Sequence, residues 1–222
     1  TRLNECDSIV NSTFEGNIGA HAAGRDSSLF VIHSANLVVN KNTFIDNRSG
    51  LDMMRLWGGD NLTISECLFS ENKVYNLLDV QKSNNDNFTF EENTLSGNVL
   101  SGMLLSYVGG NDFVRNNTIV FNESGLDLIM LYTPVSSIEY KKDVHNNTII
   151  GNNVGGGIFD ASTDFNSFYG NLIFGNIYDK ESSIIPVSDN IFKYNITPIF
   201  RIKNGDSEAS FVDYDNTNII SD

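Results

Sequence analysis

The sequence has few basic residues and no long apolar run, and these two shortages exclude nucleic-acid binding and a membrane span. It also has only two cysteines and three prolines. It has 14 Lys and Arg against 28 Asp and Glu, which gives a formal net charge of −14. Nucleic-acid binding needs clustered basic side chains, so we expect no nucleic-acid partner. A membrane-spanning helix needs about 18 or more consecutive apolar residues. The chain has no such run, so we predict no membrane span in it.

The sequence is rich, in contrast, in a short apolar motif that ends in asparagine, such as Thr43-Phe44-Ile45-Asp46-Asn47. Copies end at Asn17, Asn47, Asn72, Asn98, Asn122, Asn152 and Asn176, so the spacings are 30, 25, 26, 24, 30 and 24 residues. A period of this length is typical of a solenoid.

Each copy keeps the same residue types at the same distance from its terminal asparagine. Large apolar residues stand three and eight positions before it, and the position five before it is Ser12, Asn42, Cys67, Asn93, Asn117, Asn147 or Asn171. Fixed offsets indicate coils stacked in register, with the apolar columns inside. We expect the asparagines to take left-handed backbone angles at the bends and to bond to one another along the axis. Cys67 replaces one of them and should be buried.

A second strand in each coil is predicted between the copies, at 29–33, 53–57, 77–81, 104–108, 128–132 and 158–162. Most of these segments begin with two apolar neighbours, such as Met53 and Met54. Neighbours within one strand face opposite sides of the sheet. One side would fill the rod, and we expect the other to be covered by a loop, by the C-terminal segment or by a partner.

The pattern resembles the right-handed parallel β-helix superfamily with the pectin-lyase-like fold, and within it the asparagine-rich repeats of extracellular adhesin-like proteins. The resemblance rests on 116–122 and 146–152, both with the pattern N-N-T-I-x-x-N, and covers about residues 8–178. It implies an all-β, right-handed parallel β-helix solenoid of about 7–8 coils. We assign 1–178 to the repeats, and 179–222 to a last irregular coil with a C-terminal cap or linker. An antiparallel sandwich is the alternative fold.

The resemblance leaves the activity open, because the superfamily includes polysaccharide lyases and hydrolases, phage tailspikes, adhesins and inert rods. Glycan-cleaving members carry acids and bases on the outside of one sheet, where we give His33, Arg55 and Asp79 the same offset. Arg55 would neutralise a uronate beside a general base. The structural alternative is a cross-strand Arg–Asp ion pair. Trp57 and Tyr132 would offer stacking platforms to a glycan.

Sequons for N-glycosylation occur at predicted accessible positions, namely Asn11, Asn61, Asn87, Asn116 and Asn146. Those at Asn47 and Asn122 belong to an inner column and should be poorly accessible. Glycine-rich calcium-binding repeats are absent from the sequence, so we predict no metal site and no other cofactor.

We therefore expect a non-enzymatic extracellular or cell-surface rod, adhesin-like or filament-forming. The repeat is already running by Ser8 without a cap, the second strands are apolar on both faces, and the sequence offers no convincing catalytic cluster. This predicts self-association, either head to tail or laterally. One alternative is a polysaccharide lyase or hydrolase that uses His33, Arg55 and Asp79. The other is a glycan-binding module that uses Trp57 and Tyr132.

Overall fold

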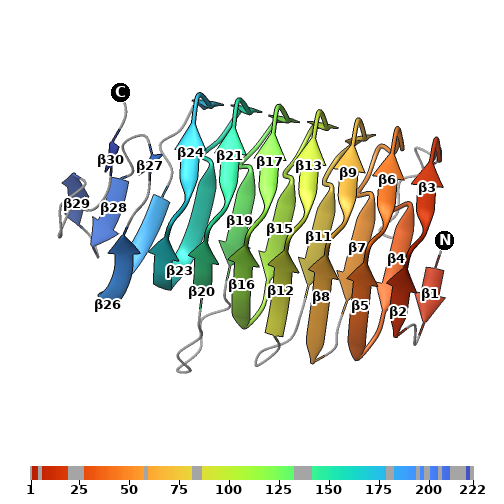
Figure 1. Ribbon diagram of the computed structural model, residues 1–222, viewed down its shortest axis with the longest axis horizontal. Helices are drawn as coiled ribbons and strands as arrows, with labels where there is room; N and C mark the ends of the chain where they lie inside the picture. Colours follow the sequence, from red (N-terminus) through yellow and green to blue (C-terminus); the bar gives the residue numbers. More distant parts are fainter. Residues whose placement is uncertain are drawn as a thin grey trace.

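The computed structural model describes residues 2–4, 7–19, 28–57, 60–81, 87–132, 142–178, 183–193, 196–197, 201–204, 207–210 and 219–220. Every element assigned within these ranges is a β-strand. None of the described residues belongs to a helix that is long and apolar enough to span a membrane. The strands wind around a rod whose long axis runs from β1 at one end to β29 at the other (Figure 1).

One turn of the chain passes along four sides of the rod. The first side holds β1 (Arg2–Asn4), β4 (Phe30–His33), β7 (Met54–Trp57), β11 (Leu78–Gln81), β15 (Leu105–Val108), β19 (Ile129–Tyr132) and the beginning of β23 (Phe159–Tyr169). The second side holds β2 (Ser8–Val10), β5 (Asn36–Asn40), β8 (Asn61–Ser65), β12 (Asn87–Glu91), β16 (Asn111–Arg115), β20 (Lys142–His145) and the end of β23.

The third side is a sheet of nine strands: β3 (Thr13–Glu15), β6 (Thr43–Ile45), β9 (Leu68–Ser70), β13 (Thr94–Ser96), β17 (Thr118–Val120), β21 (Thr148–Ile150), β24 (Leu172–Phe174), β27 (Ile196–Thr197) and β30 (Ile219–Ile220). The short fourth side holds β10 (Lys73–Val74), β14 (Val99–Leu100), β18 (Glu123–Ser124), β22 (Asn153–Val154) and β25 (Ile177–Tyr178). Three further strands, β26 (Ser183–Lys193), β28 (Arg201–Asn204) and β29 (Ser207–Ser210), continue from the end of the first sheet.

Successive turns pair strand on strand in parallel, and the predicted all-β parallel solenoid is confirmed. Strand β12, for example, pairs in register with β8 on one side and with β16 on the other. Among the described residues only β28 and β29 pair in antiparallel orientation. Because β23 pairs with both β19 and β20, the first and second sides form one continuous sheet. The sandwich alternative, which needs antiparallel sheets, is excluded.

The number of complete turns is smaller than the 7–8 coils predicted. The fourth side has five strands, so about five turns carry strands on all four sides. The two turns before them reach this side only through isolated bridges, from Ile18 to Arg48 and from Arg48 to Lys73. A single bridge does not make a strand, which explains the lower count.

Both predicted apolar columns lie in the core. The column three positions before the ladder asparagine is fully buried from the second copy on, at Phe44, Phe69, Leu95, Ile119, Ile149 and Ile173. The column eight positions before it is buried likewise, at Val39, Ile64, Phe90, Val114, Val144 and Phe168. The rings of Phe14, Phe44 and Phe69 stack with centroids 4.9 Å apart, which matches the distance between paired strands. Hydrophobic burial therefore runs along the rod from Val39 to Ile173 in the described residues.

The apolar neighbours at the start of the first-side strands do not form an exposed strip. Met53 and Met54 are both 0% exposed, and so are Leu77 and Leu78. The first member of each pair lies in a bend just before the strand, so both side chains point into the core of the same chain. The predicted need for a cover over these pairs was therefore wrong, because strand alternation does not apply at a bend.

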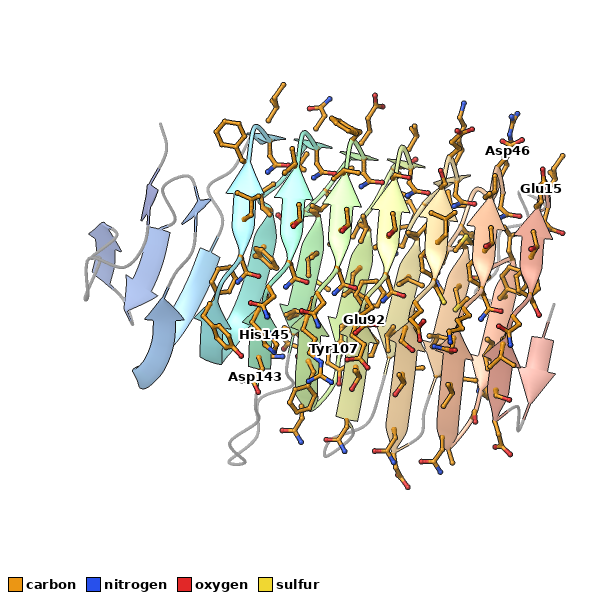
Figure 2. The ribbon with its side chains drawn as sticks, in the orientation of Figure 1. Glu15, Asp46, Glu92, Tyr107, Asp143 and His145 are labelled. Carbon is orange, nitrogen blue, oxygen red and sulfur yellow. The ribbon has the colours of Figure 1, made fainter. Side chains whose placement is uncertain are left out.

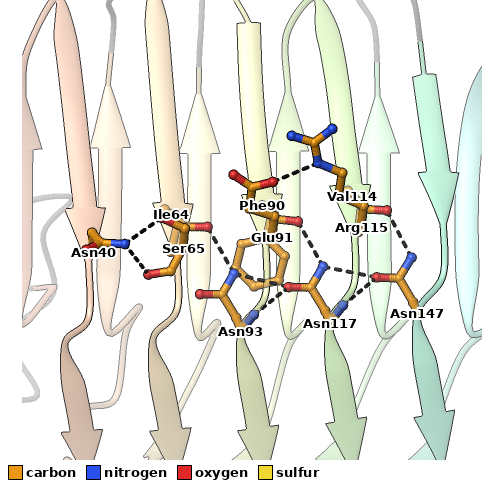
Figure 3. A network of polar contacts seen from close by, with 10 residues as sticks. All are labelled: Asn40, Ile64, Ser65, Phe90, Glu91, Asn93, Val114, Arg115, Asn117 and Asn147. Carbon is orange, nitrogen blue, oxygen red and sulfur yellow. Dashed lines mark hydrogen bonds and ion pairs between the residues drawn. The ribbon is translucent and has the colours of Figure 1, made fainter.

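Two ladders of side-chain amides run along the rod, as predicted. Asn98 in the first ladder accepts hydrogen bonds at Oδ1 from the backbone N–H and Nδ2 of Asn72, at 3.1 and 2.9 Å. Its Nδ2 donates to the carbonyl oxygen of Phe69 at 3.0 Å and to Oδ1 of Asn122 at 2.8 Å. Every donor and acceptor of this buried amide is thus satisfied. The second ladder has the same geometry through Asn93, Asn117 and Asn147 (Figure 3).

The left-handed backbone angles fall on the residue before each ladder position, so their predicted placement on the ladder asparagines was wrong. Before the first ladder these residues are Gly16, Asp46, Glu71, Gly97, Phe121, Gly151 and Gly175, and before the second they are Asn11, Lys41, Glu66, Glu92, Asn116, Asn146 and Gly170, all with φ between 48° and 66°. The sharp turn leaves the next residue free to direct its N–H and side chain along the axis.

Cys67 interrupts the second ladder. Its thiol is buried, as predicted, and burial raises the pKa of the Cys67 thiol. Sγ lies 3.5 Å from the backbone N of Asn42 and 3.6 Å from the carbonyl oxygen of Val39, where an amide would make ordinary hydrogen bonds. The backbone N–H of Cys67 still donates to Oδ1 of Asn93 at 3.0 Å. Two coils are therefore joined here by weak sulfur contacts.

Replacing Cys67 with asparagine should stabilise the protein. The new amide would accept from Asn42 and donate to Val39 and Asn93, and each hydrogen bond contributes about 1 kcal/mol net. We expect the free energy of unfolding to rise by roughly 1–2 kcal/mol, measured by denaturant titration. Cys67→Ala is the control that removes the thiol without repairing the ladder. An asparagine variant no more stable than the alanine variant would contradict the ladder's role.

Phe121→Gly should also stabilise the chain. A left-handed angle costs a non-glycine residue about 1–2 kcal/mol, and glycine loses about 0.5–1 kcal/mol of entropy, so we expect a net gain of roughly 0.5–1 kcal/mol. Phe121 is 68% exposed, so little packing is lost. Val120→Gly, at a strand position beside it, should destabilise instead. Thermal unfolding of the two variants checks this, and a loss of stability in Phe121→Gly would show that the exposed ring contributes more than its strain costs.

Candidate functional site on the outer face of the first side

A charged cluster lies on the outer face of the first side, at Asp52, Arg55 and Asp79. Strands β7 and β11 place Arg55 and Asp79 in register as neighbours. Arg55 Nε lies 3.0 Å from Asp79 Oδ2, and Arg55 Nη2 pairs with Asp52 Oδ2. The side chains are only 14%, 7% and 1% exposed for Arg55, Asp79 and Asp52. The sequence indicated the Arg55–Asp79 pair but not Asp52, which lies in the bend three residues before Arg55.

The two carboxylates of this cluster share one guanidinium. Burial raises the pKa of Asp79, the negative charge of Asp52 raises it further, and Arg55 opposes both. Gln81 Nε2 donates to Asp79 Oδ2 at 3.3 Å, and Ser28 Oγ lies 3.4 Å from Asp52 Oδ2. The cluster therefore sets one guanidinium against two carboxylates beneath the surface. It does not present an exposed base beside a free cation.

His33 does not belong to this cluster, so the offset assigned to it was wrong. In the parallel register Val31 is the neighbour of Arg55, and His33 is the neighbour of Trp57. The rings of His33 and Trp57 meet edge to face, with centroids 5.3 Å apart. His33 stands two positions beyond the residue that pairs with Arg55, and the inward-outward alternation of the strands fixes this register. The structure thus separates His33 from the Arg55–Asp79 pair.

Trp57 and Tyr132 do share one outward column. Register links His33, Trp57, Gln81, Val108 and Tyr132 in this order across the first side. Trp57 and Tyr132 are three strands apart, or about 14 Å at the usual inter-strand spacing. Tyr132 is 39% exposed, and Trp57 is half-buried. The column therefore carries three aromatic rings, one amide and the aliphatic Val108 along the rod axis.

A second outward column, on the second side, contains Asn40, Ser65, Glu91, Arg115, His145 and Tyr169. Arg115 Nε pairs with Glu91 Oε2 at 2.7 Å (Figure 3), and the His145 ring stacks on Tyr169 with centroids 4.7 Å apart. Burial lowers the pKa of His145, the positive charge of Arg115 lowers it further, and Asp143 opposes them. Figure 2 labels His145 and Asp143 on β20. These surroundings thus favour the neutral imidazole over the imidazolium form.

A buried ion pair, which the sequence analysis missed, lies inside the rod. Lys142 Nζ pairs with Asp112 Oδ2, and the two side chains are 1% and 0% exposed. Both residues stand ten positions before their ladder asparagines, where the preceding copies have Leu37, Leu62 and Phe88. Listing the residue ten positions before the ladder asparagine in these five copies would have shown two charged residues after three apolar ones.

The five sequons named above lie at exposed positions, whereas Asn47 and Asn122 are buried. Asn61 and Asn87 also belong to an exposed amide ladder on the second side, together with Asn36 and Asn111. Their Nδ2 atoms donate along this ladder at 2.8–3.1 Å. Glycosylation of the five asparagines remains a prediction.

No group of three or more His, Cys, Asp or Glu side chains within the described ranges could hold a metal ion. Cys67 lies inside the second ladder, while His33 and His145 stand on the first and second sides. Cys6 and His21 lie outside the described residues.

The stacked parallel coils define a β-helix protein of the pectin-lyase-like kind. The model of the NosD family, described as "Periplasmic copper-binding protein (NosD)", matches residues 6–209. The chain therefore belongs to the NosD family, and its resemblance to right-handed β-helix proteins is confirmed. Neither the curated proteins nor the solved structures gave a significant match.

His145 should make stability depend on pH. The pKa of His145 in the folded chain lies below its ordinary value of 6.5. As the pH falls through that value, the unfolded chain therefore binds more protons than the folded chain, and the folded chain loses stability. The melting temperature of the wild type should therefore fall between about pH 7.5 and about pH 5.5, and it should fall less in His145→Gln.

The matched control for this effect is Arg115→Gln. Its charge contributes to the lowered pKa of His145, so its removal should reduce the pH dependence only in part. Thermal melts of the three proteins across the pH range provide the measurement. Equal slopes in the wild type and His145→Gln would contradict the assignment.

Proposed function

We propose that this chain is a non-enzymatic β-helix rod of the cell envelope or cell surface, with an adhesin-like structural role. The observation that carries the proposal is the pair of amide ladders, in which buried asparagines such as Asn98 use all their hydrogen-bonding groups. Such a ladder resists bending and local opening, because each coil is tied to both neighbours. The family's description as periplasmic supports a location outside the cytoplasm.

The charged cluster on the first side favours a structural role over catalysis. A general base must reach the proton that it removes, within about 2.6–3.2 Å. Asp79 is instead paired with Arg55 and only 7% exposed, and Asp52 is 1% exposed. His33, the third member of the catalytic alternative, stands beside Trp57. The cluster therefore suits an ion pair that holds neighbouring coils in register.

Copper, which the family description names, finds no converging set of His and Cys side chains among the described residues. Copper sites use imidazole, thiolate or thioether ligands that converge on one point. Here the Cys67 thiol is enclosed by the ladder, with its pKa raised by burial, and His145 stacks on Tyr169. His33 contacts Trp57 instead. The described histidines and cysteine therefore supply no common site for copper.

Glycan binding is the second candidate, and the column from His33 to Tyr132 favours it. Aromatic side chains with one apolar face and one polar edge suit carbohydrate surfaces. Trp57 and Tyr132 lie on one line parallel to the axis, with Gln81 between them as a polar partner. An extended glycan laid along the rod would meet these side chains in turn.

The proposed rod is also expected to associate with itself. Buried pairs such as Met53 and Met54 do not support self-association. Exposed apolar side chains elsewhere on the chain support it. Phe121, Phe174 and Ile177 are 68%, 53% and 69% exposed, near the turns between the third and fourth sides. Lateral contact between rods would cover them.

Incubation with polyuronates and with neutral glycans tests the absence of catalysis. We expect no unsaturated ends and no new reducing ends above those of a heat-denatured sample. Turnover that disappears in Asp79→Asn would overturn the non-enzymatic proposal. Turnover that survives in this variant would also overturn it, and would move the site away from the cluster.

Binding and assembly are measured separately on the same protein. If the aromatic column binds glycans, Trp57→Ala should weaken retention on the same glycans at least about tenfold, since the lost contact exceeds about 1.4 kcal/mol. Tyr75→Ala is the matched control, because Tyr75 is 41% exposed but lies outside the column. Electron microscopy and sedimentation velocity should show associated rods, and a strictly monomeric particle would contradict the proposed self-association.

A further inference from the structure

The pair of Asp112 and Lys142 is unusual because it is buried in a column that the preceding coils fill with Leu37, Leu62 and Phe88. Asp112 on β16 and Lys142 on β20 are direct neighbours in the parallel register, and both point into the rod. Phe88 precedes Asp112 in the same inward column and is fully buried. Tyr107, labelled in Figure 2, lies on the facing first side and is also fully buried. Its ring stacks on that of Phe88 with centroids 4.8 Å apart. Lys142 Nζ lies 5.7 Å from the centre of the Tyr107 ring.

Burying an ion pair at this place costs more free energy than burying apolar residues. Two charges taken out of water lose several kcal/mol of solvation each, and apolar residues of similar volume often stabilise as well or better. The earlier coils have apolar residues at this position, since Leu37, Leu62 and Phe88 fill the same column. The pair therefore calls for an explanation beyond packing.

We propose that Asp112 and Lys142 form an intramolecular amide (isopeptide) bond after the chain has folded. The nucleophile is the uncharged Lys142 amine, and the electrophile is the carbon of the Asp112 carboxylic acid. The proton that converts the carboxylate into the acid comes from the Lys142 ammonium group. This proton transfer within the contact leaves an amine beside a carboxylic acid, which is the pair that reacts.

The bond changes balance without a further reactant. Lys142 Nζ forms a bond to Asp112 Cγ, and one C–O bond of the carboxyl group breaks. The departing oxygen leaves as water, carrying the hydroxyl hydrogen of the acid and one hydrogen of the amine. No oxidation or reduction occurs, and the product is a neutral secondary amide between neighbouring coils.

The fold supplies two conditions that this condensation does not have in aqueous solution, namely close contact of the two groups and exclusion of water. The strand register holds amine and carboxyl groups in contact, and well-oriented intramolecular partners react as if at concentrations of roughly 10⁵–10⁸ M. Bulk water, which drives amides toward hydrolysis, is excluded, because the Lys142 and Asp112 side chains are only 1% and 0% exposed. The reaction also removes two buried charges. The product would tie together coils whose linked residues are 30 positions apart in the sequence.

Mass spectrometry of the intact, denatured wild-type chain tests the proposal directly. We expect a mass lower than the sequence mass by one molecule of water. Proteolysis should then give one branched peptide that joins the segments containing Asp112 and Lys142. The unmodified mass, or a water loss located elsewhere, would overturn the proposal. This readout does not depend on whether any variant folds.

Variants and an internal control sharpen the result. Lys142→Arg and Asp112→Leu should each show the full sequence mass, because the nucleophile or the carboxyl carbon is gone. The exposed pair of Lys41 and Glu66, 3.5 Å apart, should give no branched peptide in the same digest. A sample of the chain that is held in denaturant from its synthesis onward should keep the full sequence mass. The same sample should lose one molecule of water only after it has been refolded. Water loss in the denatured chain would contradict a bond made by the fold.

Discussion

The hydrogen bonds between stacked asparagine side chains are the interaction on which the rest of this rod depends. A parallel coil must turn several times per circuit, and each turn leaves backbone N–H and C=O groups that no strand satisfies. An asparagine such as Asn122 fills that need, since its amide bonds a carbonyl oxygen of one neighbouring coil and the asparagines of both. The left-handed residue before it makes the geometry available. Register, and with it every outward column, follows from these contacts.

The fixed register explains the order of the surface. Outward side chains at one offset become neighbours along the axis, as Arg55 and Asp79 do on the first side and Glu91 and Arg115 on the second. Opposite charges placed one strand apart pair with each other. The same regularity brings Lys142 against Asp112 inside the rod, where water cannot compete for them. Ion pairs on the surface and a reactive pair in the core thus have one geometric origin.

Much of the fold could be predicted, because a solenoid repeats its constraints at every turn. Seven copies of one pattern identified the inner columns and the ladders, and the chain indeed buries Phe44 and bonds Asn98 as expected. The site was harder, since it depends on single residues that are not repeated. His33 was placed beside Arg55 by a count that the strand register corrects, and Asp52 was missed because it lies in a bend. A bend also explains why Met53 is buried.

The sequence by itself therefore determined the parallel solenoid, its core and its two amide ladders, because each rests on the same residue type at the same offset in coil after coil. Only the tertiary structure decided which side chains meet across coils: Trp57 with His33, Arg55 with two carboxylates, and Lys142 with Asp112. Such contacts depend on the register of particular strands and on the direction of side chains at bends. A shift of one residue moves a side chain from the surface to the core, and the pattern alone does not record that shift.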